Sequence, residues 1–326
     1  VPDVLPWLDC GQEGPRLLFV DGVLDASRSN LGPLTTGPVS IETAHPLGRL
    51  AGPSGWSLTL GRDHAPAGLV QIVHVSTGAA DHLGAEILLD VDAQASVVET
   101  FIGAGWTNRL SSISLAKGAR LMLSRRMLGA SGFVSLTDQA EVGEGASLTV
   151  AALAAGGTDS RLDAYVTLVG ESAYAEAGGA LLARGRQRHD VNLVLRHAVP
   201  NGSSRQVWRS VADDKSACSV AARIEVARDA QKTDAEQSLK GILLARSATI
   251  NAKPELEIFA DNVKCAHCAT VGELDRNALF YLESRGVGPE EARALLTRAF
   301  VADALDRIGE QPVREAFYAD TEAWFA

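Results

Sequence analysis

The pentapeptide Lys264-Cys265-Ala266-His267-Cys268 is the densest group of chemically reactive side chains in the sequence. Thiolates and imidazoles are ligands for zinc, iron and iron–sulfur clusters. On a β-strand, residues i and i+2 share a face, so we expect Cys265 and His267 to point the same way and Cys268 to point oppositely. Two ligands on one face are half of a tetrahedral site, which a partner chain can complete. The structural alternative is a buried cysteine pair beside a hydrogen-bonded histidine.

A second candidate is the polar segment Arg188–His197. His189 and Asp190 are adjacent and therefore face opposite sides of a strand, so they cannot form a catalytic dyad. We expect His189 and His197 to be solvated or bonded to loops, and Asp213-Asp214 to form a turn. The sequence has no Gly-Lys pair, no G-x-S-x-G, no H-E-x-x-H and no complete G-x-G-x-x-G. It therefore predicts no catalytic residues and no bound nucleotide.

Composition narrows the class of protein further. The 326 residues carry 40 acidic and 30 basic side chains, a net charge of −10, which argues against a nucleic-acid partner. The longest uncharged apolar runs are shorter than the roughly 20 residues that cross a membrane. Four cysteines, of which two are close together, indicate a reducing compartment, and we expect a cytoplasmic protein. The chain begins with Val and no signal-peptide pattern, so its start is either processed or truncated.

The elements that position these residues are predicted by short apolar runs between turn residues. Aromatic residues make up 5% of the chain and there are 31 glycines, which favours thin, stacked layers. An alanine followed two residues later by an aliphatic residue recurs at intervals of 24 to 31 residues; we interpret one interval of 44, from Ala173 to Ala217, as two turns of 22. This pattern predicts a mainly β solenoid.

The two ends differ from this core. We predict a Pro-rich segment over 1–65, a β-helix core over 66–271 and a helical segment over 272–326. The first helix is capped by Asp275 and ends near Gly286, the second runs from Pro289 to about Gly309, and the third from Pro312 to Phe325. These helices either cap the last coil or form a docking surface for a partner.

Several motifs together resemble the SufB/SufD family, and SufD more than SufB. They are DAQKTDAEQ from Asp229, KPELEIFADNVKCAHCATVGELD from Lys253 and ALFYLESRG from Ala278. The resemblance is specific over about 185–310, and the phrase from Phe19 to Gly22 is similar to one near the start of the family. Family members usually have Gly where this chain has Cys268, and they carry a helical N-terminal domain.

The resemblance implies a right-handed parallel β-helix that acts as a non-enzymatic scaffold in iron–sulfur cluster assembly. A SufB-like subunit would pair with the β-helix, and a SufC-like ATPase would bind the helices of 272–326. Cys265 and His267 match the family positions at the subunit interface where a transient cluster or iron would be held. Cys268 is a further candidate ligand, and the isolated chain is a candidate homodimer.

Two other functions fit parts of the sequence. A β-helix enzyme acting on polysaccharide would need clustered carboxylates, for which Asp190, Asp213 and Asp214 are the candidates. A homodimeric metal-binding protein would use Cys265, His267 and Cys268 without any role in cluster assembly.

Overall fold

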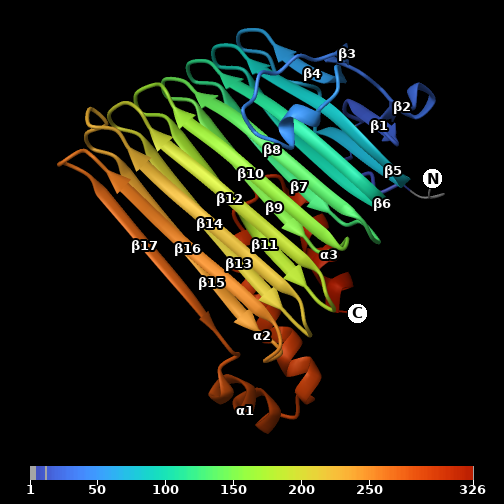
Figure 1. Ribbon diagram of the computed structural model, residues 1–326, viewed down its shortest axis with the longest axis vertical. Coiled ribbons are helices and arrows are strands. Elements are labelled where there is room, and N and C mark those ends of the chain that lie inside the picture. Colours follow the sequence, from blue (N-terminus) through green and yellow to red (C-terminus); the bar gives the residue numbers. More distant parts are fainter. Residues whose placement is uncertain (1–4, 12, 326) are drawn as a thin grey trace.

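The computed structural model describes residues 5–11 and 13–325, which form a parallel β-solenoid followed by three helices (Figure 1). Successive strands alternate between two parallel ladders, called ladder 1 and ladder 2 below, so each coil gives one strand to each ladder. The long strands β5 (Val70–Leu89) and β6 (Gln94–Leu115) bend and contribute to both ladders. The predicted mainly β solenoid with a small helical segment is confirmed.

The remaining strands divide between the ladders as follows. Ladder 1 continues through β1 (Arg16–Val20), β7 (Arg120–Met127), β9 (Ser147–Ala154), β11 (Tyr174–Ala183), β13 (Ser203–Ala212), β15 (Asp234–Leu243) and β17 (Lys264–Gly272). Ladder 2 continues through β4 (Ser54–Leu60), β8 (Phe133–Val142), β10 (Asp159–Leu168), β12 (Arg188–His197), β14 (Ala217–Val226) and β16 (Thr249–Ile258).

Short elements decorate the first coils. The strands β2 (Val23–Leu24) and β3 (Leu34–Pro38) pair antiparallel with β1 and β4, and two 3-10 turns, η1 (Ala26–Arg28) and η2 (Gly48–Leu50), follow them along the chain. The Pro-rich stretch therefore supplies β1 and β4 to the ladders. Among the described residues, no helix combines the length and the apolar character needed to span a membrane.

Side chains at equivalent positions of successive coils form rows that point into the solenoid, because each strand pairs in register with the strand of the next coil. Leu162, Leu193 and Ala222 are typical: each lies in ladder 2, faces inward and is nearly fully buried. Thin coils leave little space between the ladders, so aliphatic side chains and alanines fill most of the core. This packing explains the scarcity of aromatic residues.

Successive strands of ladder 1 are offset by 26 to 31 residues, which agrees with the predicted recurrence of 24 to 31 residues. Tyr174 pairs with Ser203 in ladder 1, and His189 pairs with Cys218 in ladder 2, which are both steps of 29 residues. The interval from Ala173 to Ala217 is therefore not two turns of 22. Ala173 precedes a strand of ladder 1 while Ala217 begins a strand of ladder 2, so this interval crosses from one face to the other.

The helices α1 (Arg276–Ser284), α2 (Pro289–Leu305) and α3 (Gln311–Phe325) begin and end near the predicted positions. The Asp275 carboxylate accepts hydrogen bonds from the first backbone N–H groups of α1, as expected of an N-cap. The α2 and α3 helices pack on the outer face of ladder 1, behind the strands in Figure 1, where Val301 and Phe317 are fully buried.

Ion pairs fix this packing. Arg126 of β7 binds Asp320 of α3 at 2.7 Å, and Arg209 of β13 pairs with Asp303 of α2. The prediction that the helices cap the last coil is wrong: they run back along the outside of the solenoid toward its first coils. An amphipathic sequence shows that a helix buries one face, but it does not show which surface covers that face.

Candidate functional site

The motif of Cys265, His267 and Cys268 lies on β17, the last strand of ladder 1. β17 pairs in parallel with β15, which places Cys265 beside Ala235, His267 beside Gln237 and Cys268 beside Ser238. In Figure 1, β17 forms the free edge of the stack, next to β16. The candidate ligands therefore lie on the terminal coil.

The register separates the three side chains into two rows. Ala235 and Gln237 are 2% and 1% exposed and belong to the interior row of the solenoid. Cys265 and His267 prolong that interior row, whereas Cys268 lies in the outer row with Ser238. Cys268 does not need the conformational freedom of a glycine, because it is extended and is not among the residues with positive φ.

Cys265 is half-buried against a small apolar cluster that includes Ala235 and Ala260. Burial raises the pKa of its thiol, and the nearby Asp234 carboxylate raises it further. A raised pKa keeps the group as a thiol, so it needs a cation to become a thiolate ligand. A bound metal cation would supply such a charge and would couple deprotonation of Cys265 to metal binding.

His267 is exposed, and its ring makes no hydrogen bond to any described residue. All four cysteines are free, with Cys265 half-buried and Cys268 exposed. The structural alternative of a buried cysteine pair beside a hydrogen-bonded histidine is therefore wrong. His267 is exposed and Cys265 only half-buried because no further coil of the described chain stacks on β17.

Cys265 and His267 are not part of a larger group of possible metal ligands in the part of the chain that the structure describes. Over residues 5–11 and 13–325, no three His, Cys, Asp or Glu side chains are grouped so that they could hold a metal ion. Cys265 and His267 offer one soft and one borderline ligand on a common face, and tetrahedral sites use about four. The described residues therefore provide two of these four candidate ligands on this face.

The uncovered end of the solenoid is called the open end below, and it is formed by β17 and the neighbouring strand β16. The inward-facing residues of β16 continue the buried row of β14 but are themselves partly exposed: Ile250, Ala252, Pro254, Leu256 and Ile258. Nearby, Phe259 is 65% exposed and Val271 is 42% exposed. Unpaired strand edges with apolar side chains favour the addition of another chain.

The histidines of β12 are placed differently from the prediction. His189 and His197 are fully buried in the lumen, where His189 Nδ1 lies 2.8 Å from Ser160 Oγ and His197 Nε2 lies 2.9 Å from Ser204 Oγ. Burial lowers the pKa of each to about 4, so both are neutral. The expectation of solvated or loop-bonded histidines is wrong, because alternation along β12 directs both inward.

The carboxylates considered for a polysaccharide enzyme do not form a groove site. Asp213 and Asp214 occupy the predicted turn after β13, where Asp214 has φ of 53° and accepts a hydrogen bond from the Gly185 backbone N–H. Asp190 lies within β12 of the other ladder, half-buried, and burial raises its pKa. These residues supply no paired acid and base across a cleft.

The sequence did not reveal a buried ionic network in the first coils. Arg125 Nε donates to Glu99 Oε2 at 3.0 Å and the same guanidinium pairs with Asp138, while Arg109 Nη1 donates to Asp81 Oδ1 at 2.6 Å. His74 joins the two halves, since its ring contacts both Arg109 and Glu99. The sequence did contain a signal for this network, namely oppositely charged residues at inward-facing positions of adjacent strands.

The fold defines a class, a parallel β-solenoid, and here the last coil carries Cys265 and His267 on one face. A family model described as "SUF system FeS cluster assembly, SufBD core domain" matches residues 74–300. The chain therefore belongs to this family.

Curated relatives agree with this assignment. An iron–sulfur cluster assembly SufBD family protein of Synechocystis is 36% identical over 46% of this chain and 33% of its own length. The iron–sulfur cluster assembly protein SufD of Escherichia coli is 26% identical over 79% of this chain and 64% of its own length. The chloroplastic protein ABCI7 of Arabidopsis thaliana is 28% identical over 70% and 50%, respectively. The chain thus spans between a third and about two thirds of these relatives.

Proposed function

We propose that this chain is a SufD-like, non-catalytic scaffold subunit in iron–sulfur cluster assembly, and that its open end pairs with a SufB-like subunit. The observation that carries the proposal is the placement of Cys265 and His267 in the interior row of an uncovered last coil. A partner that stacks on this coil would also bring its own side chains next to both ligands. Nascent cluster or iron is the cargo of such a site.

The partner surface has two components that support pairing. The edges of β16 and β17 offer backbone groups for strand addition, and the inward row of β16 offers apolar side chains. Pro254 in β16 and the charged residues beside it limit indiscriminate pairing along this edge. A specific partner must therefore match both the apolar row and these interruptions.

We also propose that the helical segment 272–326 binds a SufC-like ATPase through α1. Phe280 and Tyr281 of α1 are 73% and 57% exposed, whereas Val301 of α2 and Phe317 of α3 are fully buried against ladder 1. Exposed aromatic side chains are typical anchors of protein interfaces. ATP-driven movement of the partner would then reach the open end through β17, which directly precedes α1.

Co-purification with SufB-like and SufC-like subunits tests this assignment. Val271→Asp places a charge on the open end and should abolish pairing with the SufB-like subunit, while Phe280→Ala should weaken binding of the ATPase. Tyr165→Asp, on the outer face of ladder 2, is the matched control for a charged substitution at an exposed apolar residue. Association that survives Val271→Asp, or self-association alone without either partner, would contradict the proposal.

A further inference from the structure

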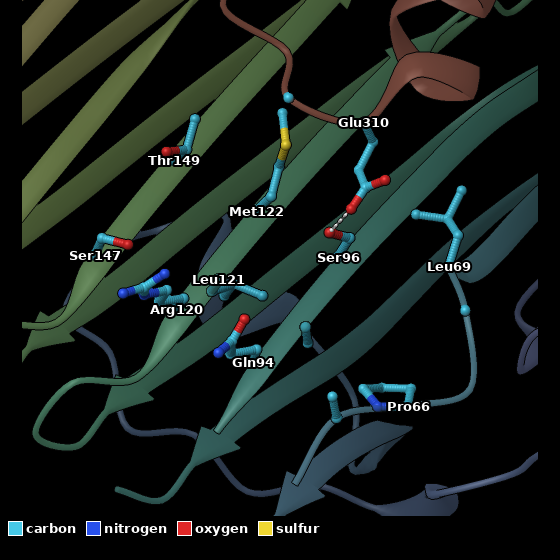
Figure 2. A pocket seen from close by; sticks show the side chains of 14 residues that line it. Pro66, Leu69, Gln94, Ser96, Arg120, Leu121, Met122, Ser147, Thr149 and Glu310 are labelled. Carbon is cyan, nitrogen blue, oxygen red and sulfur yellow. Dashed lines mark hydrogen bonds between the residues drawn. The ribbon is translucent and has the colours of Figure 1, made fainter. Parts of the chain in front are cut away.

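A cavity of about 640 Å³ lies on the outer face of ladder 1, away from the open end. Its floor is formed by the first residues of β6, β7 and β9, and its walls by the segment 65–69 and by Gly309 and Glu310 before α3 (Figure 2). Small-molecule sites commonly have volumes of about 300–1,000 Å³. Nothing in the proposed scaffold function uses this cavity.

One end of the floor is basic. The guanidinium of Arg120 is exposed and forms no ion pair or hydrogen bond with any described residue. Figure 2 shows it between the hydroxyl of Ser147 and the amide of Gln94. These three groups can all donate hydrogen bonds, and a planar guanidinium matches a carboxylate in particular.

The opposite wall is acidic. Ser96 Oγ donates a hydrogen bond of 2.6 Å to Glu310 Oε1, and this contact orients the carboxylate toward the floor. Glu310 Oε2 has no partner among the described residues, and no ion pair joins Glu310 to Arg120 across the cavity. The carboxylate can therefore accept hydrogen bonds from an ammonium group.

We infer that this cavity binds a zwitterionic amino acid or short peptide, with its carboxylate at Arg120 and its ammonium group at Glu310. Met122 lines the same cavity beside Thr149, its register partner in β9, and its thioether provides a surface for an aliphatic ligand chain (Figure 2). Arg120 belongs to the solenoid and Glu310 to the turn between α2 and α3, so the bound ligand links the helical segment to the coils.

Isothermal titration with glycine, diglycine, triglycine and tetraglycine tests this inference, because the series carries the same two charges at increasing separation. One member should bind best, and its N-acetylated and C-amidated forms should each bind at least about tenfold more weakly, since each loses a charge-assisted hydrogen bond. The best ligand should also raise the melting temperature.

Charge-neutral variants then assign each end of the ligand. Arg120→Gln should weaken binding of the free peptide about tenfold but have no further effect on the C-amidated form, and Glu310→Gln should behave likewise with the N-acetylated form. Arg196→Gln and Glu141→Gln remove exposed charges from ladder 2 and serve as controls without effect. Absence of binding up to about 10 mM, equal binding of capped peptides, or unchanged affinity in Arg120→Gln would overturn the inference.

Discussion

The first coils and the last coil share the solenoid architecture but differ in their inward-facing residues. In the first coils, the lumen contains a satisfied ionic network around Arg125, and α3 covers the outer face. In the last coil, the inward row ends in Cys265 and His267, which no further coil covers. Buried charges must be paired where they cannot reach solvent, whereas the uncovered side chains of the last coil remain accessible to a partner. The contrast separates a region that stabilises the fold from a region that is available for function.

The largest effect should come from breaking the buried network. Arg125→Met leaves the Glu99 and Asp138 carboxylates in the lumen without their cation, which should lower the free energy of unfolding by about 3–5 kcal/mol. Arg223→Met, which removes exposed ion pairs to Glu255 and Glu257, should change it far less. Urea titration of both variants measures this difference, and equal losses would remove the distinction between the two regions.

A slightly smaller loss in the free energy of unfolding is expected for substitutions in the buried helix α3, and almost none for substitutions in the exposed helix α1. Phe317 of α3 is fully buried, so Phe317→Ala should destabilise the chain by about 3 kcal/mol through the cavity that it leaves. Phe280→Ala, at the exposed surface of α1, should leave the unfolding midpoint unchanged. Thermal and urea unfolding measure both midpoints. Equal midpoints for the two variants would contradict the distinction between a packed α3 and an exposed α1.

Buried histidines should make stability depend on pH. Burial lowers the pKa of His189 and of His197 from 6.5 to about 4, and burial with the nearby Arg109 does the same for His74. The unfolded state therefore binds more protons between these values, so stability should fall as the pH drops from about 6.5 toward 4. Each histidine contributes a slope of up to about 1.4 kcal/mol per pH unit.

Unfolding measured at several pH values checks this dependence, and His189→Leu should reduce the slope by the share of one histidine. A free energy of unfolding that is flat between pH 6.5 and 4.5 would show that these imidazoles are not kept neutral in the lumen.

The smallest effect of all is expected at Cys268, on the open end. Cys268 is exposed in the outer row, so Cys268→Gly, the residue usual in the family, should leave cluster assembly and pairing intact. Iron analysis of anaerobically purified complex with and without this substitution measures the effect. Loss of iron in Cys268→Gly would make Cys268 a ligand and assign the outer row a role in the site.

The solenoid and the shared face of Cys265 and His267 were predictable because strand alternation is a local property of the sequence. The coil length was also predictable from the 27-residue steps Ala119–Ala146 and Ala146–Ala173. The interval from Ala173 to Ala217 was misinterpreted, since an alanine spacing does not distinguish one ladder from the other. The position of α2 and α3 could not be predicted, because it depends on which distant strands these helices pack against. The inward orientation of His189 and His197 followed from alternation along β12, but their polarity suggested solvent instead.

The central claim is that the uncovered interior row of the last coil supplies part of a cluster site. Cys265→Ala and His267→Ala should each leave the free energy of unfolding nearly unchanged, because no coil packs on these side chains. Anaerobic reconstitution of the complex with SufB-like and SufC-like partners, followed by spectroscopy of the cluster formed, measures their effect most directly. The account predicts at least a severalfold loss of cluster in both variants with the complex still assembled; undiminished cluster formation in both would contradict it.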